Sequence, residues 1–137
     1  MNKRINDKIN DINIYLEQLL TIKPGSFKEY EKDFKTKAAC ERYFEKITEA
    51  IIDISNILIR EKGFQSPEEE DESFEILNKE GIIDSALFIK LKNIKGMRNI
   101  LAHQYGEVDD KIVYIAINEE IHADAKEFLE IINKINK

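Results

Sequence analysis

An arginine and a histidine five residues apart, Arg98 and His103, are the pair of side chains in this sequence best suited to phosphate chemistry. A guanidinium offers planar hydrogen-bond donors and a permanent positive charge to a phosphate. An imidazole takes up and returns a proton near neutral pH. Together they supply what cleavage of a phosphodiester such as RNA needs in the absence of a metal ion.

The spacing of the pair sets a geometric condition on any site. Five residues of α-helix turn through about 500°, so Arg98 and His103 would lie about 140° apart around one helix axis. Two arrangements remain open. Either the helix ends before His103, for which Gly106 is a plausible terminator, or the working site combines Arg98 of one copy with His103 of another.

The rest of the chain predicts a helical scaffold. Apolar residues recur at alternating steps of three and four, and the interruptions are short. Lys23-Pro24-Gly25 is one interruption, and Ser26 with Glu29 forms a capping box in the short turn after it. This pattern predicts an all-α, up-and-down bundle of about five helices in a single domain, residues 1–137. The predicted helices are residues 2–20, 36–62, a short helix from the capping box Ser66–Glu69 to Gly81, a helix from Asp84 into the motif, and a last helix from Asp109 or Asp110 to residue 134.

Composition excludes several classes of protein. The net charge of −6 argues against a broad, nonspecific nucleic-acid binder, although not against a local basic site. No apolar run could span a bilayer and the amino terminus lacks a signal-peptide pattern, so we expect no membrane association. Cys40 is the only cysteine, so no intrachain disulfide can form and a reducing cytoplasm is favoured. It lies on an apolar stripe, which disfavours a cysteine hydrolase. Two histidines without a cysteine cluster make a zinc enzyme improbable, so no metal and no cofactor are expected.

Three lysines precede the motif and are candidates for RNA binding. Lys90, Lys92 and Lys95, with Arg98, form a local basic cluster in an acidic chain. The alternative is that they are ordinary solvated lysines on a helix surface. Arg98 itself is placed about 40° from Ile94, at the edge of the apolar stripe, where an arginine is half-buried and needs an anionic partner.

The motif Arg98-Asn99-x-x-x-His103, continued as His103-x-Tyr105, resembles that of the HEPN superfamily, and its extended form is similar to the HepT toxins of toxin–antitoxin pairs. The resemblance covers residues 5–134. It implies a HEPN-like helical bundle that forms a homodimer, with two copies of the motif face to face in a composite site.

The resemblance also implies a reaction and a partner. The expected activity is metal-independent endoribonuclease cleavage, in which the ribose 2′-hydroxyl attacks its own phosphate and leaves a 2′,3′-cyclic phosphate and a 5′-hydroxyl. His103 would be the general base or acid, Arg98 would neutralise charge on the phosphate, and Asn99 would support them. The implied partner is a minimal nucleotidyltransferase antitoxin that adds AMP to Tyr105, placing bulk and negative charge beside the phosphate pocket.

Each motif residue also has a structural interpretation. His103 could bind the last carbonyls of its helix, Arg98 could belong to an ion pair, Asn99 could bridge backbone, and Tyr105 could pack in the bundle. The main alternative function is therefore a noncatalytic helical module that binds a nucleotide or a nucleotidyltransferase partner. A purely structural dimer is a third possibility.

Overall fold

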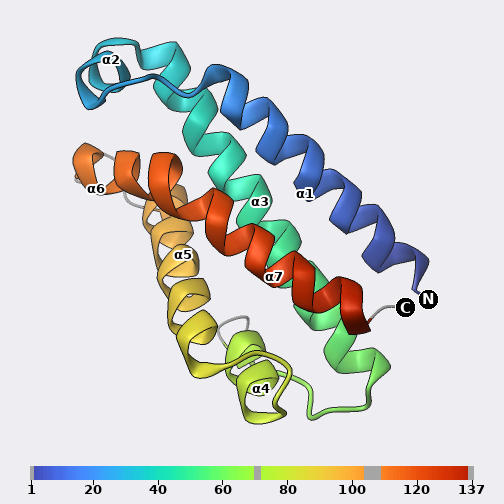
Figure 1. Cartoon of the computed structure of the whole chain (residues 1–137). Coiled ribbons are helices and arrows are strands. Elements are labelled where there is room, and N and C mark those ends of the chain that lie inside the picture. Colours follow the sequence, from blue (N-terminus) through green and yellow to red (C-terminus); the bar gives the residue numbers. More distant parts are fainter. Residues whose placement is uncertain (1, 70–71, 104–108, 136–137) are drawn as a thin grey trace.

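The computed structural model describes residues 2–69, 72–103 and 109–135. Its long helical runs alternate in direction, so the chain forms the predicted up-and-down, all-α bundle, and the start of α1 lies at the same end of the bundle as the end of α7 (Figure 1). A hydrophobic core runs through all the long helices. The elements are α1 (Lys3–Ile22), α2 (Phe27–Lys32), α3 (Phe34–Glu61), α4 (Ser73–Lys79), α5 (Ser85–His103), α6 (Asp110–Ile115), the π-helical segment η2 (Ala116–Glu120) and α7 (Ile121–Ile135).

The central helix is α3, which contacts α1, α4, α5 and α7. Its apolar residues are too many for one stripe, and they are nevertheless covered within the chain: Ile52, Ile57 and Ile59 are all buried. Burying such side chains is the main favourable contribution to folding. These three side chains are therefore covered by helices of the same chain.

Short-range capping bonds begin two of the helices where the sequence predicts. The carboxylate of Asp84 accepts a hydrogen bond from the backbone N–H of Leu87 at 2.8 Å and so starts α5. Asp109, rather than Asp110, caps the last helical run, because its carboxylate accepts from the backbone N–H groups of Lys111 and Ile112. Each cap satisfies donors that a helix leaves open at its first turn.

The two predicted capping boxes behave differently. Ser26 does accept from the backbone N–H of Glu29, and the segment predicted as a turn is the short helix α2. The box at Ser66 is wrong, since the next described helix, α4, begins only at Ser73. Residues 65–69 contain no large apolar side chain to bury, and a capping bond alone is too weak to hold a helical turn. Helix α4 begins where Phe74 and Leu77 enter the core.

The last helix is not the uniform α-helix that the sequence predicts. A π-helical turn, η2, separates α6 from α7. The buried residues Val113, Ile117, Ile121 and Ala125 recur at every fourth position, whereas an α-helix turns once in 3.6 residues, so each step moves about 40° around the axis. The wider π turn offsets this drift and keeps the apolar side directed at the core.

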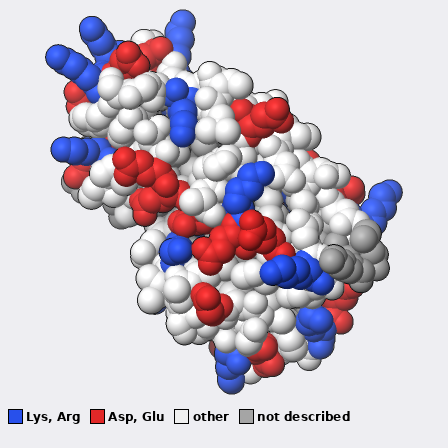
Figure 2. All heavy atoms as spheres, viewed as in Figure 1, with Lys and Arg blue, Asp and Glu red and all other residues white. Residues whose placement is uncertain are grey.

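Charges of both signs are mixed over the surface. Figure 2 shows acidic side chains gathered over the middle of the face along which α7 runs, with basic side chains scattered around them. On this face, the distribution agrees with the prediction that the chain lacks a broad basic surface. Among the residues that the structure describes, no helix combines the length and the apolar character needed to cross a bilayer.

The carboxylate of Asp124 is a buried charge that should weaken the fold. The side chain is 8% exposed, and burial raises the pKa of this carboxyl above its ordinary value of 3.8, opposed by the nearby charge of Lys90. Because the pKa is higher in the folded state, the carboxyl group does not lower the free energy of unfolding below pH 3.8. The free energy of unfolding falls as the pH rises through the folded-state pKa. Asp124→Asn is therefore expected to raise the unfolding temperature at pH 7, with an advantage that shrinks on acidification. A lower unfolding temperature at pH 7 would show that the charge is stabilising.

Candidate active site

Arg98 and His103 both lie on α5, which is helical through His103. The possibility that the helix ends before His103 is therefore wrong. On this unbroken helix the two residues are separated by about 7.5 Å along the axis and about 140° around it. One copy of the chain thus presents them on different faces, and a site that combines two copies stays a prediction.

The most deeply buried apolar side chains of α5 lie in its first half. Leu87 and Leu91 are completely buried and Ile94 is 5% exposed, as the apolar stripe predicts. From residue 97 to residue 102 every side chain is only half-buried, and these residues include the apolar Leu101. Arg98 is half-buried as predicted, and His103 is exposed in the last turn. The motif therefore lies where α5 leaves the core of its own chain.

The three candidate RNA-binding lysines do not form one surface cluster. The ammonium of Lys90 donates to a carboxylate oxygen of Glu127 on α7 at 3.2 Å, and this bond, together with the charge of Glu127, raises the pKa of Lys90. Lys95 is only 4% exposed. Lys92 is exposed, and its ammonium lies 5.9 Å from the centre of the Phe88 ring. Lys92 and Lys95 lie on a different side of α5 from Lys90. A role of the three lysines in RNA binding stays a prediction.

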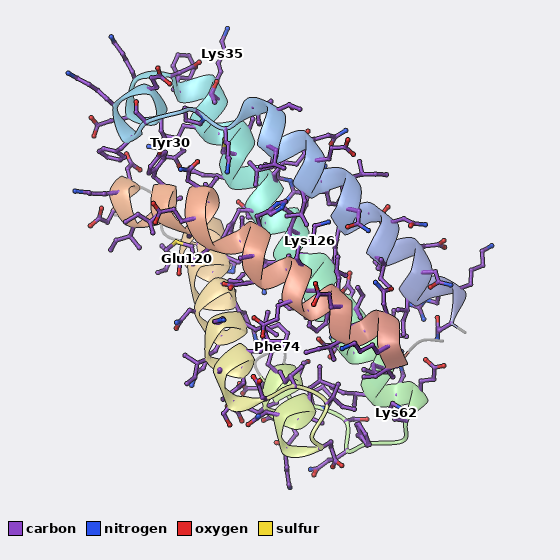
Figure 3. All side chains as sticks on the ribbon, in the orientation of Figure 1. Tyr30, Lys35, Lys62, Phe74, Glu120 and Lys126 are labelled. Carbon is purple, nitrogen blue, oxygen red and sulfur yellow. The ribbon has the colours of Figure 1, made fainter. Side chains whose placement is uncertain are left out.

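A pocket between α4 and α5 joins part of this set to the motif. Its volume is about 310 Å³, and along α5 it is lined by Lys92, Lys95, Gly96 and Asn99. The spacing of three and four residues places these positions on one side of the helix. The other lining residues are Phe88, at the start of α5, and Phe74 and Glu75 of α4; Figure 3 shows Phe74 where α4 meets α5.

The same side of α5 carries His103. Asn99 and His103 are four residues apart, which is about 40° around the axis and about 6 Å along it. The pocket, Asn99 and His103 therefore follow one another along a single side of the helix, whereas Arg98 points elsewhere. The predicted modification site, Tyr105, lies outside the described residues.

Sequence reasoning missed the contribution of α4 and of the two phenylalanines to this region. The repeat Lys92, Lys95, Asn99 and His103 was a usable signal, since it marks a polar side of a helix next to an apolar one. Nothing local in the sequence indicates that Phe74 and Glu75 lie against that side.

The remaining histidine and the cysteine are away from the motif. His122 is half-buried at the start of α7, and burial, followed by the charges of Lys126 and Lys23, lowers its pKa. Cys40 is completely buried, and burial raises the pKa of its thiol to about 11. A buried, protonated thiol is a poor nucleophile, which agrees with the rejection of a cysteine hydrolase.

Comparison with known proteins first identifies the class of fold. The chain superposes with a TM-score of 0.90 and 27% sequence identity on the tri-AMPylated HEPN toxin of Shewanella oneidensis in complex with MNT antitoxin, covering 98% of this chain and 99% of that one. The all-helical bundle of this chain thus has the fold of a HEPN toxin.

The family follows from the sequence comparisons. Residues 5–135 match the model of the family described as "HepT-like: Ribonuclease HepT-like", and the chain belongs to that family. It is 27% identical over 132 residues to the mRNA nuclease HepT of Shewanella oneidensis, spanning 96% of this chain and 98% of the relative. It is 28% identical over 114 residues to the tRNA nuclease HepT of Aphanizomenon flos-aquae, spanning 83% and 78%. The predicted HEPN resemblance and ribonuclease class are confirmed.

Proposed function

We propose that this chain, acting as a single domain over residues 1–137, is a metal-independent endoribonuclease toxin. The observation that carries the proposal is the unbroken helix α5, which holds Arg98 and His103 on different faces and leaves His103 exposed. Two copies placed with their α5 helices together would bring the arginine of one copy to the histidine of the other. The working site is then composite and belongs to a homodimer.

The chemistry assigns a distinct role to each side chain. His103 takes the proton from the ribose 2′-hydroxyl, or gives one to the departing 5′-oxygen. Arg98 of the other copy donates to the phosphate oxygens, where negative charge grows as the 2′-oxygen attacks. Asn99, next to Arg98 on the chain and one turn from His103, supports the same group. The products are a 2′,3′-cyclic phosphate and a 5′-hydroxyl.

Exposed apolar side chains around the motif support a homodimer. On α5, Ile89 is 57% exposed, and Met97 and Ile100 are half-buried. On α6, Ile112 is 54% and Ile115 is 37% exposed. Large apolar side chains left open to water near one helix are typical of a surface that a partner covers.

The partner and its action are proposed from the relatives. A structure of a HEPN toxin of the same fold is described as tri-AMPylated and in complex with MNT antitoxin. By analogy, a minimal nucleotidyltransferase antitoxin neutralises this chain by adding AMP to Tyr105. The site of action is the cytoplasm, where both RNA and such a partner are available.

Cleavage of RNA by the purified, unmodified protein in EDTA tests the proposed activity. We expect fragments that end in a 2′,3′-cyclic phosphate and begin with a 5′-hydroxyl, detected by mass spectrometry. Activity that depends on added divalent metal would contradict the mechanism. If total RNA and tRNA both stay intact, the hypothesis of a noncatalytic binding module is favoured over that of a ribonuclease.

Mixing two inactive variants tests the composite site. Arg98→Ala and His103→Ala should each be inactive, and mixed dimers should regain one intact site of two, which amounts to about a quarter of wild-type activity after random exchange. The regain arises because the arginine of one subunit and the histidine of the other are both intact in that site. No regain, with mixed dimers demonstrated by mass spectrometry, would place both residues of a site in one copy.

A further inference from the structure

We infer that the pocket between α4 and α5 binds one nucleotide of the substrate, the one adjoining the scissile phosphate, and prefers a base that carries an exocyclic amine. This inference rests on the proposed ribonuclease function. The volume of the pocket, about 310 Å³, is at the small end of the range of ligand pockets, which suits a single nucleotide rather than a longer segment.

The position of the pocket places its occupant next to the reaction. Gly96 and His103 are two turns apart on the same side of α5, about 10.5 Å along the axis, and Asn99 lies between them. A nucleotide that occupies the pocket around Gly96 is therefore placed as the strand neighbour of the one whose 2′-hydroxyl reacts at His103.

The lining offers a platform for a base. The Phe88 ring is half-buried, and the ammonium of Lys92 lies over it, 5.9 Å from the ring centre. Lys92 is exposed and its side chain is long and flexible, so a stacked base displaces the ammonium toward the phosphate of the same nucleotide. The second positive charge, on Lys95, is 4% exposed and is thus weakly screened by water.

The polar groups of the lining distinguish among bases. Glu75 places an exposed carboxylate, which accepts hydrogen bonds only, in a pocket that is otherwise positively charged. A carboxylate repels a phosphate and accepts from the amine of cytosine, adenine or guanine, and uracil has no such amine. Asn99 adds an amide that donates and accepts. Groups of both signs in one pocket fit a nucleotide better than a free phosphate.

Gly96 offers a way to fill the pocket without disturbing the fold. A Cβ atom built on this glycine would meet no atom within 4 Å, so a larger side chain has room to enter the pocket. Glycine is also a poor helix former, so both Gly96→Leu and its control Gly96→Ala should be at least as helical as the wild type. The leucine fills the space, and the alanine leaves it open.

The test measures binding of 5′-CMP and 5′-UMP by NMR titration to the full chain carrying His103→Ala, which cannot cleave RNA. We expect CMP to bind more tightly than UMP by about tenfold, Gly96→Leu to weaken CMP binding by about tenfold or more, and Gly96→Ala to change it by less than about twofold. Glu75→Gln should abolish the preference for CMP. Lys92→Ala should weaken both nucleotides alike, because it removes a phosphate contact.

The outcomes separate this pocket from the ribonuclease activity. CMP binding that Gly96→Leu blocks, in a protein whose wild-type form never cleaves RNA, would support the pocket and refute the proposed function. Equal CMP binding by Gly96→Leu and Gly96→Ala, or none by either, would overturn the pocket even if the wild type cleaves RNA. Should Gly96→Leu fail to fold, as judged by circular dichroism, unchanged binding and preference in Glu75→Gln and Lys92→Ala would overturn it instead.

Discussion

Replacing His103 by alanine is expected to lower the rate of RNA cleavage by about 10²- to 10⁴-fold, the usual contribution of a positioned general acid or base. The side chain is exposed in the last turn of α5 and supports no part of the hydrophobic core. The loss should therefore be confined to catalysis, with circular dichroism and the unfolding temperature unchanged. Single-turnover cleavage of a labelled RNA is the appropriate measurement.

The other histidine of the chain provides the matched control. His122 is half-buried on α7, on a different helix from the motif, and His122→Ala should alter the cleavage rate by less than about twofold. Added imidazole should restore part of the activity of His103→Ala, because the small base can occupy the space left by the side chain. Full activity in His103→Ala would assign His103 to the structural role of a helix terminus.

Truncating Phe128 to alanine should reduce the free energy of unfolding by about 3–5 kcal/mol, the range measured for large aromatic side chains in cores. Phe128 is completely buried on α7, the helix that packs against α1, α3 and α5. Its removal leaves a cavity between the helices that hold α5 in place. Denaturation by urea, monitored by circular dichroism, gives the free energy directly.

An exposed phenylalanine makes the same substitution without the cavity. Phe34 is 75% exposed at the start of α3, so Phe34→Ala removes identical atoms from water and should change the free energy of unfolding by only about 0.5 kcal/mol. The difference between the two variants isolates the effect of burial. A similarly small change in both variants would mean that the helices around Phe128 move together and close the cavity that its truncation leaves.

The sequence by itself determined the helices and the motif, because both depend on residues near each other in the chain. Asp84 caps α5 through Leu87, three residues away, and the apolar residues of α1 face the core at their predicted positions. The arginine and histidine of the motif were recognised from type and spacing, and the argument that one straight helix cannot bring them together needed only the geometry of the helix.

Tertiary structure decided what surrounds that motif. It placed Lys90 against Glu127 of α7, put Lys92 and Lys95 in a pocket with Phe74 of α4, and delayed the start of α4 to Ser73. Each of these outcomes depends on which helix lies next to which, and such neighbours are separated by many residues in the chain. Helix propensity and capping contribute little free energy compared with burial. Where local signals favour different helix boundaries, packing between distant segments therefore decides where a helix begins and ends.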